Sequence, residues 1–149
     1  TISSEKGAVG HSDADALIHA IIDALLGAAA LGDIGEHFPP SNPDYKGISS
    51  RKLLKQTIFL LQDAGWEPCN LDCTIVLDSP KLTSYKSAIR KIIAEDLELN
   101  LKDVSIKAKT KEGVDAVGEG RAVEAHAVVL IQKSRDTSLG IPGEDSVWV

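Results

Sequence analysis

The sequence predicts an α/β domain in which helices pack on one side of a sheet. Three observations support this prediction. With 149 residues, 43% of them hydrophobic and 26% charged, the chain is long enough for one domain with an apolar core. Three segments carry apolar side chains at helical spacing, and they alternate with segments whose apolar side chains recur at every second position. The periodicity leaves open whether the sheet is parallel or mixed.

The first predicted helix runs from about Ser12 to Ala30. Ser12 or Asp13 is suited to cap its amino terminus, and Gly32 is suited to end it. The short segment 1–10 that precedes the helix is interpreted as the end of a hairpin.

This helix carries a polar stripe that packing does not explain. Asp15, His19 and Asp23 recur at i, i+4 and i+8 and therefore share one face. The other faces already supply a core, with Leu17, Ile18, Ile21, Ile22, Leu25 and Leu26. We therefore expect the stripe to belong to a functional site.

A loop and a second helix follow. Residues 33–47 contain so many prolines and glycines that they are predicted to be loop. Ser49 or Ser50 is suited to cap a helix that continues to Ala64 and ends at Gly65. Its apolar face consists of Leu53, Leu54, Ile58, Leu60 and Leu61.

The second half of the chain is predicted to alternate strands with a helix. Residues 69–78 form a strand covered on much of both faces, because alternation passes into an aliphatic run. A helix at 84–97, with Ile89, Ile92, Ile93 and Leu97 inward, precedes strands at 104–110 and 122–132. After these the pattern fails, and 134–149 is interpreted as a disordered tail, with a docking peptide as the alternative.

Charge and cysteine content exclude several classes of protein. A net charge of −6 and a pI near 5.1 argue against a nucleic-acid or anionic-membrane partner, and no apolar run is long enough to span a bilayer. Cys69 and Cys73 have no second pair, so a disulfide framework is not expected and a cytoplasmic or organelle-stroma location fits better. The chain starts at Thr1 and lacks methionine, so we expect its amino terminus to be cut, processed or left out.

Five linked motifs occur in order at 11–19, 23–35, 38–43, 79–82 and 107–112. Together they resemble the 2-C-methyl-D-erythritol 2,4-cyclodiphosphate synthase family over most of residues 7–133. The resemblance implies a single domain over 1–133, assembled as a homotrimer with active sites between neighbouring subunits. It also implies a role in the non-mevalonate route to isoprenoid precursors.

The substrate implied by this resemblance is 4-diphosphocytidyl-2-C-methyl-D-erythritol 2-phosphate. Its 2-phosphate attacks the β-phosphorus of the diphosphate, CMP leaves, and a cyclic diphosphate forms. Such a transfer requires the attacking and leaving oxygens in line and the negative charge offset.

The resemblance assigns roles to the polar stripe and the residues before it. His19 corresponds to a ligand of zinc or another divalent cation, with Asp15 and Asp23 able to orient its ring. His11 and Ser12 correspond to the pair that contacts phosphate at a helix amino terminus, with His11 supporting the transition state. The alternative interpretations are a core or surface histidine in an ordinary helix for His19, and a simple N-cap for Ser12.

Three further segments correspond to substrate-binding parts of the family. The segment for the methylerythritol group comprises Asp33, Ile34, Gly35, Phe38, Pro39, Pro40, Ser41 and Asn42, where Pro40 and Asn42 replace acidic residues. The cytidine segment comprises Leu77, Asp78, Ser79, Pro80, Lys81, Leu82 and Thr83.

The diphosphate segment comprises Lys109, Thr110, Lys111 and Glu112. Thr110 corresponds to a catalytic stabiliser and Glu112 to a ligand of Mg²⁺ or Mn²⁺, together with substrate phosphates. Without the resemblance, these alternating lysines would be interpreted as the solvent-exposed face of a strand.

One motif of the family has no counterpart here, the Asp-x-His that supplies two further zinc ligands. We therefore expect the amino-terminal portion of the domain to be missing. Two alternatives follow, a catalytically impaired trimeric module that binds nucleotide and a different metal-dependent phosphohydrolase. Release of CMP or of inorganic phosphate separates these alternatives from the synthase.

Overall fold

The computed structural model describes residues 4–45, 47–77, 83–110 and 124–134; for residues 4–13, 77, 83, 84 and 110 the description covers the backbone only. The longer elements are α1 (Ser4–Ala28), α2 (Ile34–His37), α3 (Ser50–Asp63), β1 (Trp66–Leu77), α4 (Thr83–Leu97), β2 (Val104–Thr110) and β3 (Glu124–Lys133). Two short 3₁₀ turns accompany them, η1 (Pro43–Tyr45) and η3 (Leu101–Asp103).

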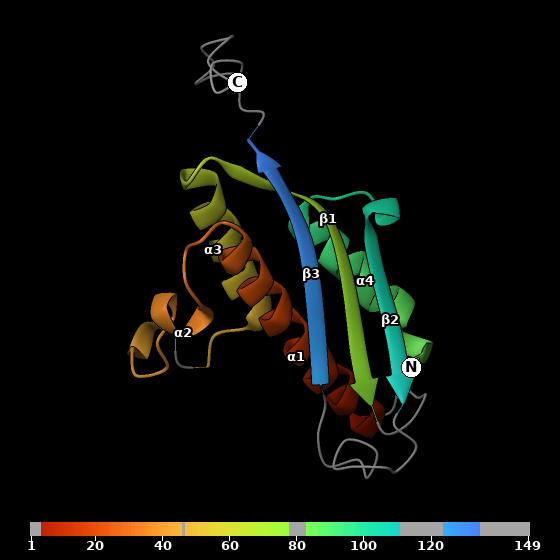
Figure 1. Ribbon diagram of the computed structural model, residues 1–149. Helices are drawn as coiled ribbons and strands as arrows, with labels where there is room; N and C mark the ends of the chain where they lie inside the picture. Colours follow the sequence, from red (N-terminus) through yellow and green to blue (C-terminus); the bar gives the residue numbers. More distant parts are fainter. Residues whose placement is uncertain (1–3, 46, 78–82, 111–123, 135–149) are drawn as a thin grey trace.

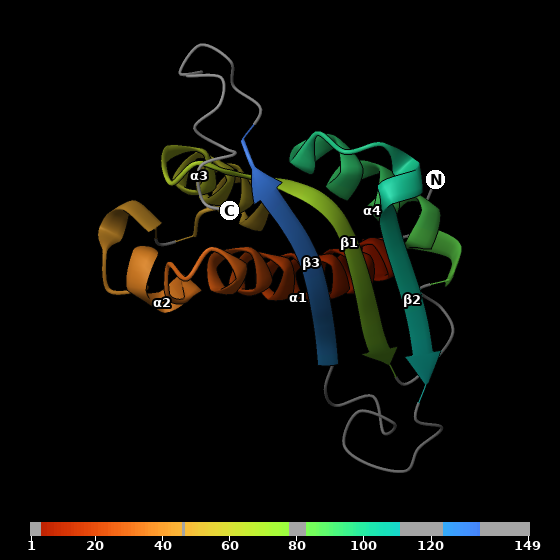
Figure 2. The ribbon, with the colours of Figure 1, turned by 45° about the horizontal axis from the view of Figure 1, so that its top comes forward.

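The three strands form one mixed sheet in the order β2-β1-β3. β1 is parallel to β2 and antiparallel to β3. The helices α1, α3 and α4 lie on one face of this sheet, as Figures 1 and 2 show, and α1 runs diagonally across it. The α/β class and the one-sided packing of the helices are therefore confirmed.

The core lies between the sheet and these helices. Its fully buried side chains come from the apolar stripes that the sequence predicts, including Leu17, Ile21, Ile22, Leu25, Leu26, Leu54, Leu61, Ile75 and Ile93. Burial of such aliphatic side chains contributes roughly 1.5–3 kcal/mol each, which makes this layer the main source of stability.

None of the described helices covers the other face of the sheet (Figure 1). On β1 the side chains of Leu71, Cys73 and Ile75 are buried, while those between them are exposed or half-buried. On β3, Val128 is 71% and Leu130 is 55% exposed. The prediction that this strand is covered on much of both faces is therefore wrong for the described residues, where α1, α3 and α4 pack on the same side, although Val76 is only 8% exposed.

The boundaries of α1 differ from the prediction at both ends. The helix begins at Ser4, so neither Ser12 nor Asp13 caps it, and segment 1–10 is not a hairpin end where it is described. At its carboxyl end Ala30 adopts φ 57°, and the N–H of Leu31 donates to the carbonyl of Leu26 at 2.8 Å. In this Schellman arrangement the helix ends at Ala28, four residues before Gly32.

The segment 33–47 is not loop throughout. Asp33 caps the single turn α2 by accepting a hydrogen bond from the N–H of Glu36, and Pro43 opens η1. Proline suits the first position of such a turn because it has no N–H to satisfy.

The remaining elements begin and end within a few residues of their predicted bounds. Ser49 caps α3 through the N–H of Lys52, and Gly65 follows the helix with φ 88°. β1 starts earlier than predicted, at Trp66, and accommodates Pro68 at a shift in its pairing with β3. None of the described helices is both long and apolar enough to cross a bilayer.

Candidate functional site

The parallel pairing of β1 and β2 brings two predicted substrate segments together. Leu77, the last residue of β1, lies opposite Thr110, the last residue of β2, and Val76 lies opposite Lys109. The connection through α4 makes this a βαβ unit, in which both strands end at the same edge of the sheet. The cytidine segment therefore starts beside the diphosphate segment.

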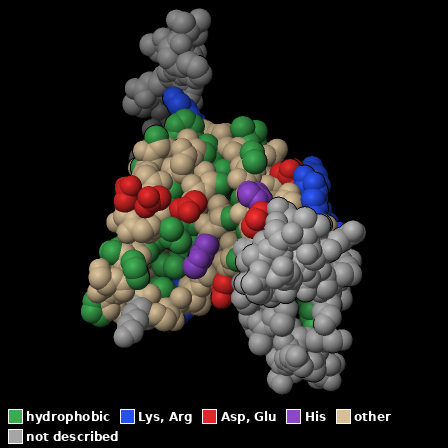
Figure 3. Space-filling model, turned by 60° about the horizontal axis from the view of Figure 1, so that its bottom comes forward, with side chains coloured by type: hydrophobic (Ala, Val, Ile, Leu, Met, Phe, Trp, Pro, Cys, Tyr) green, Lys and Arg blue, Asp and Glu red, His purple; other side chains and the backbone are tan. Residues whose placement is uncertain are grey.

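The rest of both segments lies outside the described residues. In the cytidine segment these undescribed residues are Asp78, Ser79, Pro80, Lys81 and Leu82. In the diphosphate segment they are Lys111 and Glu112. Figure 3 shows the surface near this end of the molecule, where histidine and carboxylate side chains lie among exposed apolar groups.

The structure gives the carboxylates of the polar stripe a role that differs from the predicted one. Asp15 Oδ1 accepts a hydrogen bond from Ser50 Oγ at 2.5 Å, and Asp23 Oδ1 accepts one from the N–H of Ile34 at 2.9 Å. In the described part of the chain, both carboxylates are thus bonded to the ends of the neighbouring loop rather than to His19. The expectation that they orient the His19 ring is corrected accordingly.

His11 and Ser12 do not lie at a helix amino terminus. They follow seven and eight residues after Ser4, well inside α1, where the backbone N–H groups are used by the helix itself. The predicted phosphate contact through free N–H groups at this point is therefore not supported by the backbone. The side chains of both residues lie outside the description.

The described residues do not by themselves fit a zinc centre. His19 is exposed on α1, but no three His, Cys, Asp or Glu side chains gather as metal ligands among the residues that the structure describes. Structural and catalytic zinc sites use at least three protein ligands. The predicted second ligand, Glu112, is outside the described residues.

The predicted methylerythritol segment is held by local hydrogen bonds. Asp33 caps α2, the N–H of Phe38 donates to the carbonyl of Ile34 at 2.8 Å, and the N–H of Asp44 donates to Asn42 Oδ1 at 2.9 Å. Gly35 has room for a Cβ at 3.5 Å from Asp33 Oδ1, so close packing does not require glycine there. These bonds give the segment a defined backbone conformation before any ligand binds.

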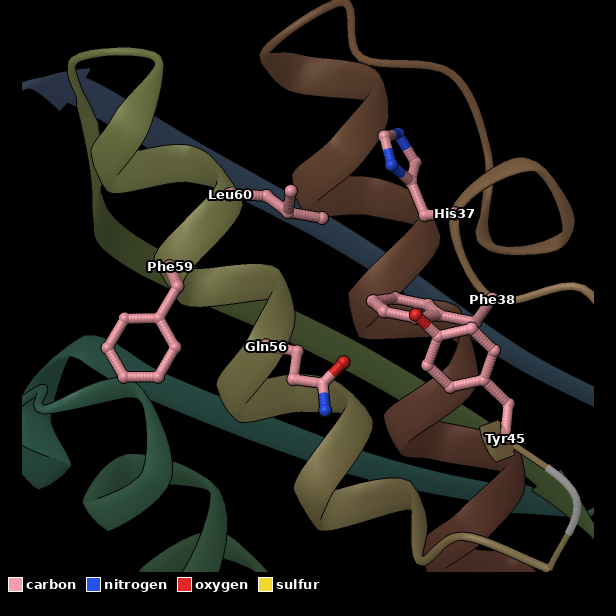
Figure 4. Close-up of a pocket in the computed structure, with 6 residues that line it drawn as sticks. All are labelled: His37, Phe38, Tyr45, Gln56, Phe59 and Leu60. Carbon is pink, nitrogen blue, oxygen red and sulfur yellow. The ribbon is translucent and has the colours of Figure 1, made fainter. Parts of the chain in front are cut away.

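Phe38 anchors this segment to the body of the domain. Its side chain is 8% exposed, and its ring meets that of Tyr45 edge to face, with the centroids 5.3 Å apart. Figure 4 shows both rings facing a pocket of about 250 Å³ that is completed by His37 and by residues of α3. The residues of α3 are Gln56, Phe59 and Leu60.

One ion pair near the site was not predicted from the sequence. Lys107 Nζ lies 3.0 Å from Asp72 Oδ2 on the open face of the sheet, where β1 and β2 are neighbours. The hydrogen bond from Lys107 lowers the pKa of Asp72 below its ordinary value of 3.8. The alternating lysines predict that this face of β2 is exposed. Only the register between β1 and β2 shows that Asp72 is the partner of Lys107.

Comparisons with known proteins found a matching family model and similar sequences. The sequence model of the YgbB family matches residues 1–132. A 2-C-methyl-D-erythritol 2,4-cyclodiphosphate synthase of Brachyspira hyodysenteriae is 47% identical over 134 residues, which cover 90% of this chain and 85% of that protein. The synthase of Chloroherpeton thalassium is 52% identical over 132 residues, which cover 89% and 84%.

Solved structures show the same fold. A 2C-methyl-D-erythritol-2,4-cyclodiphosphate synthase in its CDP-bound form superposes with a TM-score of 0.71 at 33% identity, covering 77% of this chain and 74% of that one. The CDP complex of IspF from Plasmodium falciparum gives a TM-score of 0.69 at 28% identity, covering 80% and 72%.

Proposed function

Because the chain belongs to the YgbB family, we propose that it catalyses the reaction for which its curated relatives are named. It converts 4-diphosphocytidyl-2-C-methyl-D-erythritol 2-phosphate to 2-C-methyl-D-erythritol 2,4-cyclodiphosphate and releases CMP. It is therefore a lyase of isoprenoid precursor synthesis.

The observation that carries this function is the shared edge of β1 and β2. Leu77 and Thr110 are register partners, so the segments assigned to cytidine and to diphosphate begin next to each other. A cytidine diphosphate substrate requires this adjacency, because its base and its phosphates are joined covalently. Two structurally similar synthases were solved with CDP bound, which supports the same ligand class here.

Positioning accounts for most of the chemistry in this proposal. The 2-phosphate and the β-phosphorus belong to one molecule, so the protein must fold the substrate until the attacking and leaving oxygens are in line. The cytidine segment 77–83 holds one end, and the loop residues Asp33–Gly35 and Phe38–Asn42 hold the methylerythritol group. Lys109, Lys111 and Thr110 offset the charge that spreads over the phosphates.

We assign the metal-binding positions to His19 and Glu112. A divalent cation there would offset phosphate charge, with zinc suited to the imidazole and Mg²⁺ or Mn²⁺ to the carboxylate. His11 and Ser12 are assigned to the phosphate groups through their side chains.

We further propose that the subunits form a homotrimer with active sites between neighbours. The open sheet face supports this assembly, because Val128 and Leu130 expose apolar side chains on a strand. Burial of this face between subunits would also cover the sheet side that the helices leave free.

The reaction can be tested with the purified chain, the synthetic substrate and a divalent cation. We expect CMP by chromatography and the cyclic diphosphate by ³¹P NMR, without stoichiometric inorganic phosphate. Release of inorganic phosphate would instead identify a phosphohydrolase, and CMP binding without turnover would identify a binding module.

A pair of variants on one strand sharpens the test. Thr110→Val removes the assigned hydroxyl and should lower kcat about 10- to 100-fold, whereas Thr110→Ser should retain most of it. Ser105→Ala, near the other end of β2, is the matched control and should leave turnover unchanged. Equal activity of all three variants would remove Thr110 from the catalytic set.

A further inference from the structure

We propose that Asp15 and Asp23 are positioning residues that fasten both ends of the substrate loop to α1, on either side of His19. The substrate loop is defined here as residues 34–49, from the start of α2 to the residue before α3. The proposal rests on the proposed function for the meaning of that loop. The fastening itself rests on hydrogen bonds within this chain.

The first fastening is at the start of the loop. The N–H of Ile34 belongs to the first turn of α2, where helical N–H groups have no partner within the helix. Asp23 Oδ1 accepts it at 2.9 Å from α1. Asp33, immediately before, accepts from the N–H of Glu36 at 3.0 Å. Two carboxylates therefore set the backbone where the methylerythritol segment begins.

The second fastening is at the end of the loop. Ser50, the first residue of α3, is only 6% exposed, so its hydroxyl must be satisfied by a protein partner. Asp15 Oδ1 provides that partner at 2.5 Å. Ser49 beside it caps α3 through the N–H of Lys52. The amino terminus of α3 is thus held to α1 by a charged acceptor.

The spacing of the two carboxylates relates the loop to His19. Asp15 and Asp23 are eight residues apart, which is about 12 Å along a helix, and His19 lies midway on the same face. Both ends of the loop therefore meet α1 within about one turn of His19. The helix that carries the assigned metal ligand and the loop that carries the sugar contacts are held as one unit.

This arrangement makes a kinetic prediction. A loosened loop must be reordered by each substrate that binds, which weakens binding of substrate and transition state alike. Loss of one charged hydrogen bond should therefore raise KM about tenfold and change kcat less than about twofold. A carboxylate that acted through the metal or the reacting phosphates would instead lower kcat.

Asp23 is tested with two substitutions and a control. Asp23→Ala removes the acceptor, while Asp23→Asn keeps an oxygen that can accept from the N–H of Ile34 but removes the charge. Asp63→Ala, an exposed aspartate at the end of α3, is the matched control. We expect a raised KM for Asp23→Ala, near-complete rescue by Asn, and no change for the control. A kcat loss that is equal in the Ala and Asn variants would overturn the proposal.

Asp15 is tested by a double-mutant cycle with Ser50. Asp15→Ala and Ser50→Ala should each raise KM, and the double variant should resemble either single one, because both remove the same bond. Full additivity of the two effects would show that the carboxylate and the hydroxyl act separately.

Amide hydrogen exchange keeps this proposal separate from the proposed function. Asp23→Ala should accelerate amide hydrogen exchange at least about fivefold in residues 34–45 and leave the amides of β1 protected, whether or not the chain releases CMP. If the wild-type chain released no CMP, the proposed function would be wrong. Amide hydrogen exchange would still test whether Asp23 holds the loop to α1. Unchanged exchange in 34–45 would overturn the fastening even in an active enzyme.

Discussion

Arg51 on α3 forms a two-pronged ion pair with Asp96 on α4. Nε donates to Oδ2 and Nη2 donates to Oδ1, both at 2.8 Å. The two partners differ in environment, because the Asp96 side chain is 2% exposed and that of Arg51 is 46% exposed. The pair joins α3, which precedes β1, to α4, which connects β1 to β2.

This asymmetry predicts unequal costs for the two truncations. Arg51→Ala leaves a buried carboxylate without its partner and should destabilise the fold by about 3–5 kcal/mol. Asp96→Ala leaves a guanidinium that water can reach, so its cost should be only about 1–2 kcal/mol. Urea denaturation of both variants measures the difference, and equal costs would contradict the assigned burial.

The Asp72–Lys107 pair predicts that its contribution to stability changes with pH only in the acidic range. The pKa of Asp72 is lowered by the hydrogen bond from Lys107, so its contribution to stability is present above the unfolded pKa of about 4 and is lost as pH falls through the lower folded value. NMR titration should show the pKa of Asp72 rising toward its ordinary value in Lys107→Met. A titration that Lys107→Met leaves unchanged would show that the pair does not form in solution.

The two cysteines should differ in reactivity. Burial raises the pKa of the Cys73 thiol to about 12, and its side chain is 1% exposed. At pH 8 only on the order of one Cys73 in ten thousand would be thiolate, which is the reactive form. Iodoacetamide followed by mass spectrometry should label Cys69 in the folded protein and Cys73 only after denaturation. Rapid labelling of Cys73 in the folded protein would contradict its placement in the core.

The open sheet face should control assembly if the proposed trimer forms. Val128→Glu with Leu130→Glu places charges on the two exposed apolar positions of β3 and should shift the protein from trimer toward monomer. Phe59→Glu is the control, because Phe59 is 63% exposed but lies on α3, on the helical side of the domain. Light scattering distinguishes these masses, and a trimer that survives both charges would exclude this face as the interface.

Ala30 offers a site for stabilisation. It ends α1 with φ 57°, a left-handed conformation that costs a residue with a Cβ about 1–2 kcal/mol. Ala30→Gly should therefore stabilise the fold by about 1 kcal/mol and raise Tm by about 2–4 °C. Ala29→Gly is the control and should not stabilise, because Ala29 does not have a positive φ. A lower Tm for Ala30→Gly would show that α1 ends differently in solution.

The helices and strands could be predicted largely because their signals are local. The cap at Ser49 and the breaker at Gly65 lie within a few residues of the ends that they define. The start of α1 could not be predicted in this way. A suitable cap at Ser12 does not prevent a helix from continuing upstream when residues 4–11 also adopt helical backbone.

For the candidate site, the sequence predicts segments, whereas contacts between those segments require the structure. The resemblance assigns substrate roles to the motifs around Leu77 and Thr110, and the strand register places these two residues side by side. The role predicted for Asp15 and Asp23 is wrong, because helical spacing places them beside His19 and cannot show that Ser50 and Ile34 approach from another element.

The sequence by itself determined the class of fold, the apolar layer and the family. These properties depend on periodicity and on motifs that are written along the chain. Only the tertiary structure decided that β3 leaves Val128 and Leu130 exposed, and that Asp15 and Asp23 bond to residues at the two ends of the loop between α1 and α3. Each of these depends on which distant segments meet, because a hydrogen bond or a buried face requires a partner that periodicity does not identify.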